Sequence, residues 1–404
     1  MNRQSRKKMG VVLAALVLAL NYSPALQAAG RLPDELYLYA GQTHVLESGL
    51  PMRVSVGGEA IQVAASQDER LHEVSAVADG ESSVTFSLLG LFPVHRTKVS
   101  VAQERVLIPG GQVIGVAMRT RGVLVVARGE RANALRVGDV ITAVESQPVG
   151  SSRELSALIA QADLDEVTLG VQRGNREITL RTPTPKDSTD GQRRLGVWVR
   201  DSTAGVGTLS FVDPVSGVYG ALGHAIIDAD TGDLLEVSDG AVMHASIVGV
   251  ARGQAGRAGE LRGSFLKENR QIGSLETNCE FGVYGVMDAL PGNALYPQGL
   301  PVGLRSGVHE GEATIISTVD TAGPAEYSVE IVECYEQSGP AQKGMLLRVT
   351  DPRLLEKTGG IVQGMSGSPI IQDGKLIGAV THVLVNDPTR GYGIFMETML
   401  EAAS

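Results

Sequence analysis

A serine enclosed by glycines, directly before a predicted hairpin, is the feature that most restricts how this chain can fold. The run is Gly364-Met365-Ser366-Gly367-Ser368-Pro369, and residues 370–380 follow it as a strand, an Asp-Gly turn and a second strand. An Asp-Gly dipeptide between two apolar runs is typical of a β-hairpin. A Cβ at Gly364 or Gly367 would obstruct a loop that points a hydroxyl outward and gathers backbone N–H groups at one point. Because the same residue types fill ordinary β-turns, a reactive serine and a plain turn both stay open.

Composition extends the β prediction to the whole chain. The 404 residues are enough for two or three domains, and they include 50 glycines but only 4% aromatic residues. β-branched residues recur in short runs between turn residues, which favours a mainly β fold over a helical bundle. The net charge is −10 and no basic stripe occurs, so nucleic acid is not an expected partner. No Cys/His cluster has metal-ligand spacing, so we expect neither a metal nor another cofactor.

The N-terminus has the layout of an export signal. Residues 1–29 begin with basic residues and no acid, and continue with an apolar run over 9–20 and a small-residue stretch. The apolar run is shorter than the roughly 20 residues of a membrane-spanning helix. The position that favours a small residue before cleavage holds Leu26 or Gln27, so a cleaved signal peptide and an uncleaved signal anchor both stay open. The body of the protein is expected outside the cytoplasm.

Two parts of the sequence carry no functional signal. Residues 31–105 are expected to form a small β domain, because short alternating runs are separated by Gly, Pro and Asp clusters. Cys279 and Cys334 are the only cysteines. An exported protein permits a disulfide between them, but two buried thiols are an equal alternative.

Residues 106–183 follow a different pattern from the rest of the chain. They contain the block Ala132-Asn133-Ala134-Leu135-Arg136-Val137-Gly138-Asp139-Val140-Ile141, and an amphipathic helix is expected from Ser152 to about Gln161. This combination resembles a PDZ domain, in which an extended peptide adds as a strand beside the helix and a glycine loop holds its C-terminal carboxylate. The resemblance places that peptide-binding loop on Val113, Ile114, Gly115 and Val116. A PDZ domain that serves only as a spacer or internal latch stays open as the alternative.

A polar linker over residues 184–194 precedes one large β-rich region, residues 195–404. Its many short strands, with one clear helix position at the C-terminus, fit a two-barrel fold. Within it, the Gly-x-Ser-Gly-x-Pro run resembles the nucleophile loop of chymotrypsin-like serine proteases. That resemblance implies acyl transfer with Ser366 as the nucleophile and with the N–H groups of Gly364 and Ser366 as the oxyanion hole. Ser368 is the rival nucleophile.

A serine nucleophile needs a base, and the base needs a carboxylate that orients it. His224 follows a turn and is surrounded by small residues, which leaves an imidazole accessible, so it is the expected base. His382 follows the hairpin, where this class of protease often lines its substrate groove. Two acids stay open: Asp288 fits the chain order of chymotrypsin-like enzymes, and Asp351 ends a strand shortly before Ser366.

Three stretches, residues 198–208, 219–224 and 350–369, sharpen the resemblance. They are similar to the stage IV sporulation protein B family, the signalling serine peptidases of endospore-forming bacteria. The resemblance implies a triad of His224, Asp351 and Ser366. It also implies a protein that is membrane-anchored before processing and works between the mother-cell and forespore membranes. There it would cleave itself and a membrane-bound regulator, releasing an intramembrane metalloprotease that matures a late sigma factor.

Two other classes remain as alternatives. An exported PDZ adaptor with a catalytically inactive peptidase-like domain would keep the same motifs and only bind. An α/β-hydrolase esterase would need Gly-x-Ser-x-Gly with the histidine after the serine, but position 368 is Ser and only His382 follows. For the peptidase, self-cleavage by another copy is expected between about Ala29 and Met52, where the sequence is rich in turn residues.

Overall fold

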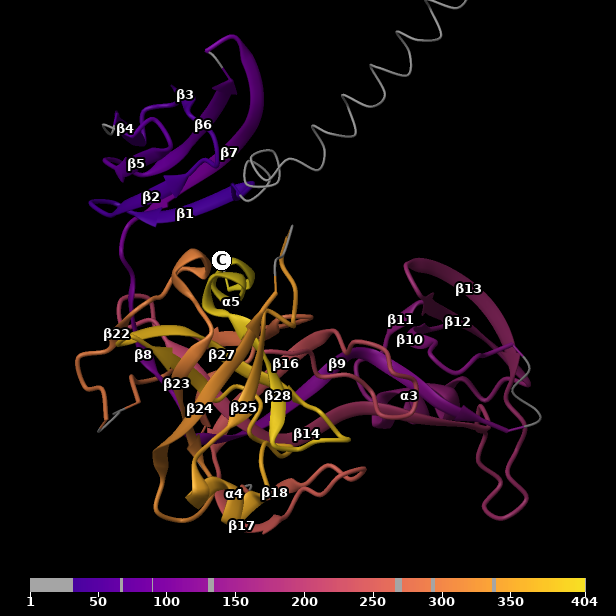
Figure 1. Ribbon diagram of the computed structural model, residues 1–404. Coiled ribbons are helices and arrows are strands. Elements are labelled where there is room, and N and C mark those ends of the chain that lie inside the picture. The colour runs from indigo at the N-terminus through magenta and orange to yellow at the C-terminus, as the bar shows by residue number, and fades with distance from the viewer. Residues whose placement is uncertain are drawn as a thin grey trace, which may run out of the picture. The chain divides into compact units, whose positions relative to one another are not determined.

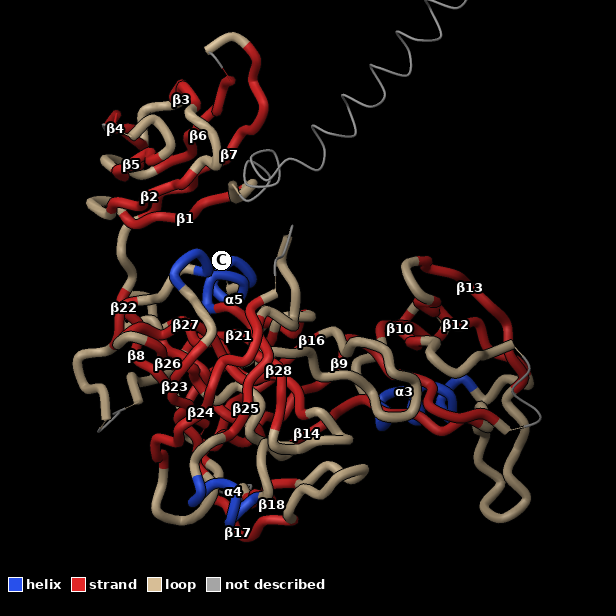
Figure 2. Tube along the Cα trace, viewed as in Figure 1, coloured by secondary structure: helices blue, strands red, loops and turns tan. Residues whose placement is uncertain are grey.

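Strands dominate both compact units into which the chain divides, which confirms the expected mainly β fold (Figure 1, Figure 2). The structure is a computed structural model that describes residues 32–403 apart from 66–67, 89, 130–133, 266–270, 292–294 and 336–338. The predicted export signal, residues 1–29, lies outside the described residues. One unit comprises Met1–Arg105 with Leu304–Gly307, and the other comprises Val106–Gly303 with Val308–Ser404. No helix in the described part of the chain is long and apolar enough to cross a membrane.

The first unit has two sheets that share one apolar core. The larger sheet has the strand order β1-β7-β6-β3, and the smaller has the order β2-β5-β4. Alternate residues of β6 and β7 face inward, so Val84, Phe86 and Val99 are fully buried. The strands are β1 (Glu35–Tyr39), β2 (Thr43–Glu47), β3 (Met52–Gly57), β4 (Ile61–Ala65), β5 (Leu71–Ala76), β6 (Gly80–Leu88) and β7 (Phe92–Ala102). A short 3-10 helix, η1 (Arg305–Gly307), belongs to the same unit.

The second unit begins with the elements expected of the PDZ domain. Its helix α3 (Ser152–Ala162) starts after Ser151, whose hydroxyl accepts a hydrogen bond from the Glu154 N–H. Leu155 and Ile159 on the apolar face of α3 pack into a core that the neighbouring strands line. This helix matches the one that the sequence predicts. The strands around it are β10 (Val140–Val144), β11 (Gln147–Pro148), β12 (Glu166–Arg173) and β13 (Arg176–Pro183).

Two 16-residue strands join the PDZ domain to the peptidase-like region. They are β9 (Val113–Arg128) and β14 (Val197–Val212), which pair antiparallel along almost their whole length. Both belong to a 13-stranded sheet whose main path is β13-β12-β10-β9-β14-β15-β21-β20. The PDZ strands are therefore continuous with the strands of the next region, as Figure 1 shows for β9 and β14.

The C-terminal half of the peptidase-like region is a closed barrel, β23-β24-β25-β28-β27-β26, around buried residues such as Ile315, Leu347 and Ile370. The N-terminal half remains part of the 13-stranded sheet. The remaining elements are β8 (Val106–Pro109), β15 (Val218–Ala221), β16 (Val237–His244), β17 (Ser246–Ala251), β18 (Glu260–Ser264), β19 (Gln271–Ser274), β20 (Thr277–Cys279), β21 (Gly282–Val286), β22 (Leu300–Pro301), β23 (Gly311–Thr318), β24 (Pro324–Cys334), β25 (Met345–Val349), α4 (Pro352–Thr358), β26 (Pro369–Gln372), β27 (Lys375–Val383), β28 (Arg390–Phe395) and α5 (Met396–Ala402).

Candidate active site

The glycine-rich loop that the sequence singles out lies between α4 and β26. Gly364 and Gly367 have φ angles of +94° and +97°, in the left-handed region that residues with a Cβ rarely adopt. A Cβ on Gly367 would also lie 2.1 Å from the carbonyl oxygen of Thr208. The backbone path of this loop therefore requires both glycines, for the steric reason expected from the sequence.

The loop leaves two backbone donors unused. The N–H groups of Met365 and Gly367 donate hydrogen bonds to backbone carbonyls. Among the described residues, none accepts a hydrogen bond from the N–H groups of Gly364 and Ser366. The Ser366 hydroxyl donates to the carbonyl oxygen of Thr381 at 2.7 Å. An anionic oxygen beside Ser366 would find two free donors at this loop.

His224 follows β15 on a tight turn, in which Leu222 and Gly223 have φ angles of +68° and +69°. Its Nδ1 lies 2.8 Å from the carbonyl oxygen of Ala225. Because a carbonyl can only accept, Nδ1 carries the proton and Nε2 of the neutral ring is left as an acceptor. Burial lowers the pKa of His224, although the contact with Ala225 opposes that effect. The imidazole is therefore neutral at pH 7 and able to take a proton.

Ser366 and His224 line the same cavity, which has a volume of about 680 Å³. Gly364, Thr381 and His382 line it as well. Most other described residues of the lining are small or apolar, and none of them is Asp, Glu, Lys or Arg. In the described structure no hydrogen bond joins Ser366 to His224, because the serine hydroxyl is turned toward Thr381. The sequence thus locates two residues from distant segments that the fold brings to one cavity.

His382 is a second imidazole on this cavity. Its ring centroid lies 5.1 Å from that of His224, with an angle of 38° between the ring planes. Burial, and then repulsion from His224 and Lys343, lower the pKa of His382 to about 4. Its buried Nδ1 has no hydrogen-bond partner among the described residues. His382 lies near the end of β27, the second strand of the hairpin, rather than after the hairpin as the sequence suggests.

Asp351, the acid that the family resemblance implies, lies elsewhere. It caps the N-terminus of α4, where its carboxylate accepts from the Arg353 N–H at 2.8 Å and pairs with the Arg353 guanidinium at 2.7 Å. The side-chain hydrogen bond from Arg353 is the largest cause that lowers the pKa of Asp351 to about 2. Asp351 is not among the residues that line the cavity, and no described contact joins it to His224. Asp288, the alternative acid, is exposed and is not part of the lining either.

The structure corrects the position of the PDZ carboxylate loop. Val113, Ile114, Gly115 and Val116 lie in strand β9, and Ile114 to Val116 pair with β14 on one edge and with β16 on the other. With both edges paired, this part of the backbone cannot bind a peptide carboxylate. The side chains of Val113, Ile114 and Val116 are buried, and a Cβ on Gly115 would lie 2.6 Å from the Phe265 ring. The pairing partners are distant in sequence, so the local glycine pattern did not reveal them.

Two open questions from the sequence concern side chains away from the cavity. Ser368, the rival nucleophile, is fully buried and does not line the cavity. Cys279 and Cys334 are both free thiols, each partly buried. The described structure therefore has no disulfide between them.

A closed barrel that carries the serine, facing an open sheet that carries the histidine, is the architecture of a chymotrypsin-like serine endopeptidase. In this molecule a PDZ domain is built into the same sheet. The chain belongs to the SpoIVB peptidase S55 family, whose model matches residues 191–400, and a PDZ domain model matches residues 113–184. No curated protein matches the chain.

Solved structures similar to this chain include a PDZ domain and two proteases. The PDZ domain of the SdrC-like protein from Listeria monocytogenes is 20% identical over 20% of this chain and 87% of its own, with a TM-score of 0.19. The active form of the Rv3671c protease from M. tuberculosis is 15% identical over 49% of this chain and 72% of its own, with a TM-score of 0.28. The HtrA-type protease AlgW with tripeptide is 14% identical over 49% of this chain and 54% of its own, with a TM-score of 0.28.

Proposed function

We propose that this protein is an exported endopeptidase in which Ser366 is the nucleophile and His224 is the general base. His224 Nε2 takes the hydroxyl proton while Ser366 Oγ attacks a peptide carbonyl. The N–H groups of Gly364 and Ser366 stabilise the resulting oxyanion. The intermediate then expels the amine, which receives the proton from His224, and water hydrolyses the acyl-enzyme by the same steps in reverse order.

One observation carries this proposal: a hydroxyl and a neutral imidazole line one cavity, and the two residues whose N–H groups are unused, Gly364 and Ser366, line it as well. Backbone donors inside a protein are nearly always paired, so two unused donors beside a partly buried hydroxyl indicate a place reserved for a ligand oxygen. The Ala225 carbonyl fixes the imidazole in the tautomer that a general base needs.

Binding of substrate would also free the nucleophile. The Ser366 hydroxyl donates its hydrogen bond to the Thr381 carbonyl near the end of β27. A peptide that adds as a strand there offers its own backbone N–H to that carbonyl. The serine then turns about its Cα–Cβ bond toward His224.

In this proposal Asp351 acts on the nucleophile loop through α4 rather than on the imidazole. Its carboxylate holds the first turn of α4, and the chain leaves that helix at Gly359, shortly before Gly364. The Ala225 carbonyl takes the orienting role that a carboxylate has in other triads. A loss of Asp351 should therefore lower stability more than it lowers the rate of the folded enzyme.

The biological role that we propose follows from the family. The protein is anchored in a membrane by its N-terminal segment, lies between the mother-cell and forespore membranes, and cleaves other copies of itself. It also cleaves a membrane-bound regulator of an intramembrane metalloprotease, and so triggers sigma-factor processing during endospore formation. The signal-like segment over residues 1–29 and the membership of the S55 family support this role.

The cavity favours uncharged, apolar substrate side chains beside the cleaved bond. Its lining includes Val206, Leu222, Ile226 and Val362, and its described part has no Asp, Glu, Lys or Arg side chain to pair with a charged group of the substrate. A buried charge without a partner is strongly unfavourable, so charged side chains should be rejected.

N-terminal sequencing of mature protein made with wild-type and Ser366→Ala enzyme tests the proposal. Self-cleavage predicts a mature N-terminus between about Ala29 and Met52 in the wild type that is absent from Ser366→Ala. The alternative, a PDZ adaptor with an inactive peptidase domain, predicts the same N-terminus for both proteins. Adding wild-type enzyme to Ser366→Ala protein should restore the cut, because cleavage is proposed to occur between copies.

A further inference from the structure

An apolar part of the first compact unit stands outside its core, where β6 turns into β7. The connection between these two strands projects from the rest of the unit (Figure 1). Leu91, Phe92 and Val94, around the start of β7, are 76%, 63% and 50% exposed. Single exposed apolar residues are common on proteins, but a group of this kind marks a contact surface. We call residues 91–94 the apolar tip.

The strand pairing holds the apolar tip away from the core. Val99 of β7 is fully buried in the core of this unit, whereas Phe92 and Val94 are exposed on the other side of the strand. The pairing of β7 with β6 passes from His95 to Pro93, which leaves Val94 bulged out of the ladder. The fold therefore directs these apolar side chains toward solvent.

Two arginines flank the apolar tip. A Cβ on Gly90 would lie 3.0 Å from the Cδ of Arg53, so the Arg53 side chain lies against the turn that precedes the tip. Arg96 follows shortly after Val94 and donates to the Ser83 hydroxyl at 3.1 Å. Both arginines are exposed, and in the described part of the chain neither contacts a carboxylate. Each guanidinium is therefore available to an anion from outside the chain.

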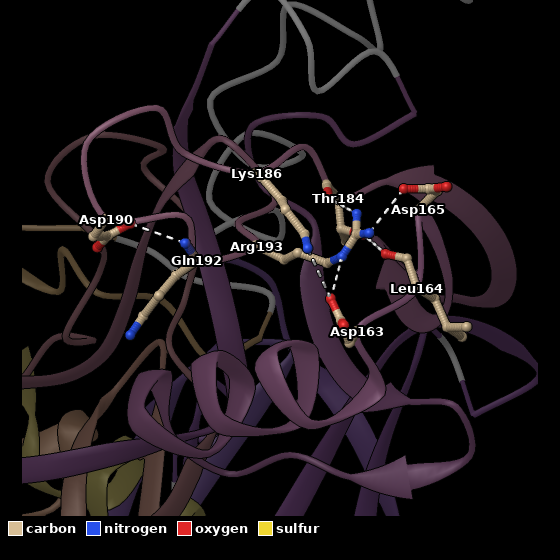
Figure 3. Close-up of polar contacts among 8 residues, drawn as sticks. All are labelled: Asp163, Leu164, Asp165, Thr184, Lys186, Asp190, Gln192 and Arg193. Carbon is tan, nitrogen blue, oxygen red and sulfur yellow. Dashed lines mark hydrogen bonds and ion pairs between the residues drawn. The ribbon is translucent and has the colours of Figure 1, made fainter.

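Several basic side chains in other parts of the molecule are held by carboxylates. Figure 3 shows the polar linker before β14, where Arg193 contacts Asp163 and Asp165, both at 2.8 Å. In the same cluster Lys186 lies 3.7 Å from Asp163. These cations are neutralised within the protein, in contrast to the two arginines beside the apolar tip.

The hairpin that carries the tip is locally basic, although the whole chain has a net charge of −10. The sequence has no acidic residue between Glu81 and Glu104. Glu81 itself is paired with Lys98 at 2.6 Å, further along β7 from the tip. An anionic surface could therefore approach the tip without meeting a carboxylate of the hairpin.

The chain from the signal-like N-terminus reaches this unit at the end of β7 that carries the tip. β1 runs parallel to β7, and just before β1 the Pro33 carbonyl lies 3.1 Å from the His95 Nε2. His95 is about 10 Å along the strand from the start of β7. Residues 21–31, which follow the apolar run over 9–20, can span at most about 40 Å. A bilayer that holds that apolar run is therefore within reach of the tip.

We propose that the apolar tip inserts into the surface of a lipid bilayer and that Arg53 and Arg96 bind the phosphates of its anionic lipids. The apolar side chains leave water, while the backbone of the turn stays at the depth of the headgroups, where water still pairs its polar groups. After the signal-like segment is cut away, the tip keeps the enzyme at the membrane that holds its regulator. That consequence rests on the proposed function, whereas lipid binding does not.

Binding is tested by sedimentation with vesicles of phosphatidylglycerol and phosphatidylcholine in equal parts. The parent protein is the chain from Gly30 onward with Ser366→Ala, which keeps every described residue, lacks the signal-like segment and cannot cut itself. Leu91→Ser combined with Phe92→Ser should weaken binding at least about tenfold. Val77→Ser is the matched control, because Val77 is 47% exposed and precedes β6 at the end away from the tip. It should bind like the parent.

Two further measurements separate the charges from the insertion. Arg53→Gln combined with Arg96→Gln should weaken binding to these vesicles about tenfold, and should leave the weaker binding to pure phosphatidylcholine unchanged. Phe92→Trp in a chain with Trp198→Phe has a single tryptophan, at the tip. Its fluorescence should be quenched by brominated lipids, and unquenched fluorescence in the bound protein would overturn the insertion.

Equal binding of the parent and the Leu91→Ser/Phe92→Ser variant, or no binding of the parent to the anionic vesicles, would overturn the proposal. A parent that self-associates in sedimentation velocity without binding vesicles, beside a monomeric tip variant, would assign the tip to a second copy instead.

The consequence for the substrate is tested with the active enzyme. The tip variant should hydrolyse a soluble apolar peptide like the wild type, but a lipid-anchored peptide in vesicles at least about fivefold more slowly. Equal rates on the anchored peptide would overturn the role of the tip in reaching membrane-bound substrates. A wild type that is inactive on both peptides would contradict the proposed catalysis and leave the lipid binding standing.

Discussion

The cavity at Ser366 and the groove at α3 are both suited to an extended peptide, but they differ in what they leave free. In the described structure the cavity leaves an imidazole nitrogen and two backbone N–H groups without partners, and its serine hydroxyl donates to the Thr381 carbonyl. At α3, residues 197–200 of β14 pair with β9 along one edge, and the Ser152 N–H at the start of the helix donates to Asp201. Unused polar groups thus identify the candidate active site, whereas the polar groups that hold the start of β14 to the PDZ domain are already paired.

Replacing Ser366 should produce the largest effect. Ser366→Ala removes the only proposed nucleophile, so peptide hydrolysis should fall by at least about a thousandfold with little change in stability. Steady-state hydrolysis of an apolar peptide substrate measures it. Ser368→Ala is the matched control, because Ser368 is buried away from the cavity, and it should stay within a few-fold of the wild type. A large loss in Ser368→Ala with Ser366→Ala active would exchange the two roles.

Replacing Asp351 distinguishes a role of this carboxylate in holding α4 from a direct role in catalysis. Asp351→Ala removes the cap of α4 and should destabilise the protein by about 1 kcal/mol, measured by chemical unfolding. The folded variant should hydrolyse a small ester within about tenfold of the wild type. A loss as large as that of His224→Ala would show that Asp351 serves the imidazole.

The pKa of Asp351 gives the same prediction a pH dependence. Because its folded-state pKa is lowered to about 2 from an ordinary value of 3.8, its carboxylate stabilises the fold above pH 3.8. That stabilisation should be lost as the pH falls through about 2. The difference in stability between the wild type and Asp351→Asn should therefore shrink toward low pH, and a constant difference would contradict the assigned ion pair.

The start of β14, residues 197–201, offers a smaller, local effect. Asp201→Asn should speed hydrogen exchange of the backbone amides of residues 197–200 by about tenfold, because the start of β14 separates from β9 more often once Asp201 no longer holds it to Ser152. Amides of the hairpin over residues 370–380 should exchange as in the wild type, since that hairpin is held by barrel strands. Equal acceleration in both places would indicate general destabilisation rather than local opening at the start of β14.

The smallest expected effect is a shift in the midpoint of the acid limb of the pH–rate profile. Only neutral His224 accepts a proton, so kcat/KM should rise with pH through the pKa of His224. Burial lowers that pKa, so the midpoint should fall below the ordinary value of 6.5. His382→Asn should leave this limb almost unchanged, since His382 is already neutral above about pH 4. A midpoint above 6.5 would contradict the buried, neutral base.

Local features of the fold could be predicted from the sequence, and pairings between distant segments could not. The nucleophile loop and its hairpin follow from glycines at positive φ and from an Asp-Gly turn, in which Asp373 and Gly374 have φ angles of +50° and +72°. α3 follows from its cap and its apolar face. The burial of Gly115 depends on β14 and β16, which lie far along the chain. The local glycine pattern around Gly115 therefore predicts a loop where the structure has a paired strand.

The candidate site divides in the same way. The small residues around His224 and the glycines around Ser366 indicated two exposed side chains, and the fold brings them to one cavity. The cap and the ion pair that hold Asp351 depend on α4 and on Arg353, whose geometry no motif expresses. The pairing of the start of β14 with β9 depends on where the linker returns the chain, which the local PDZ pattern does not contain.

Labelling by a fluorophosphonate measures most directly whether Ser366 is an activated nucleophile. The reagent reacts with a serine whose proton is taken by a neighbouring base, and mass spectrometry of the digest locates the adduct. We expect one adduct, on Ser366, in the wild type, a rate at least about a hundredfold lower in His224→Ala, and none in Ser366→Ala. An unlabelled wild type, or equal labelling of Ser366→Ala at another residue, would contradict catalysis by Ser366.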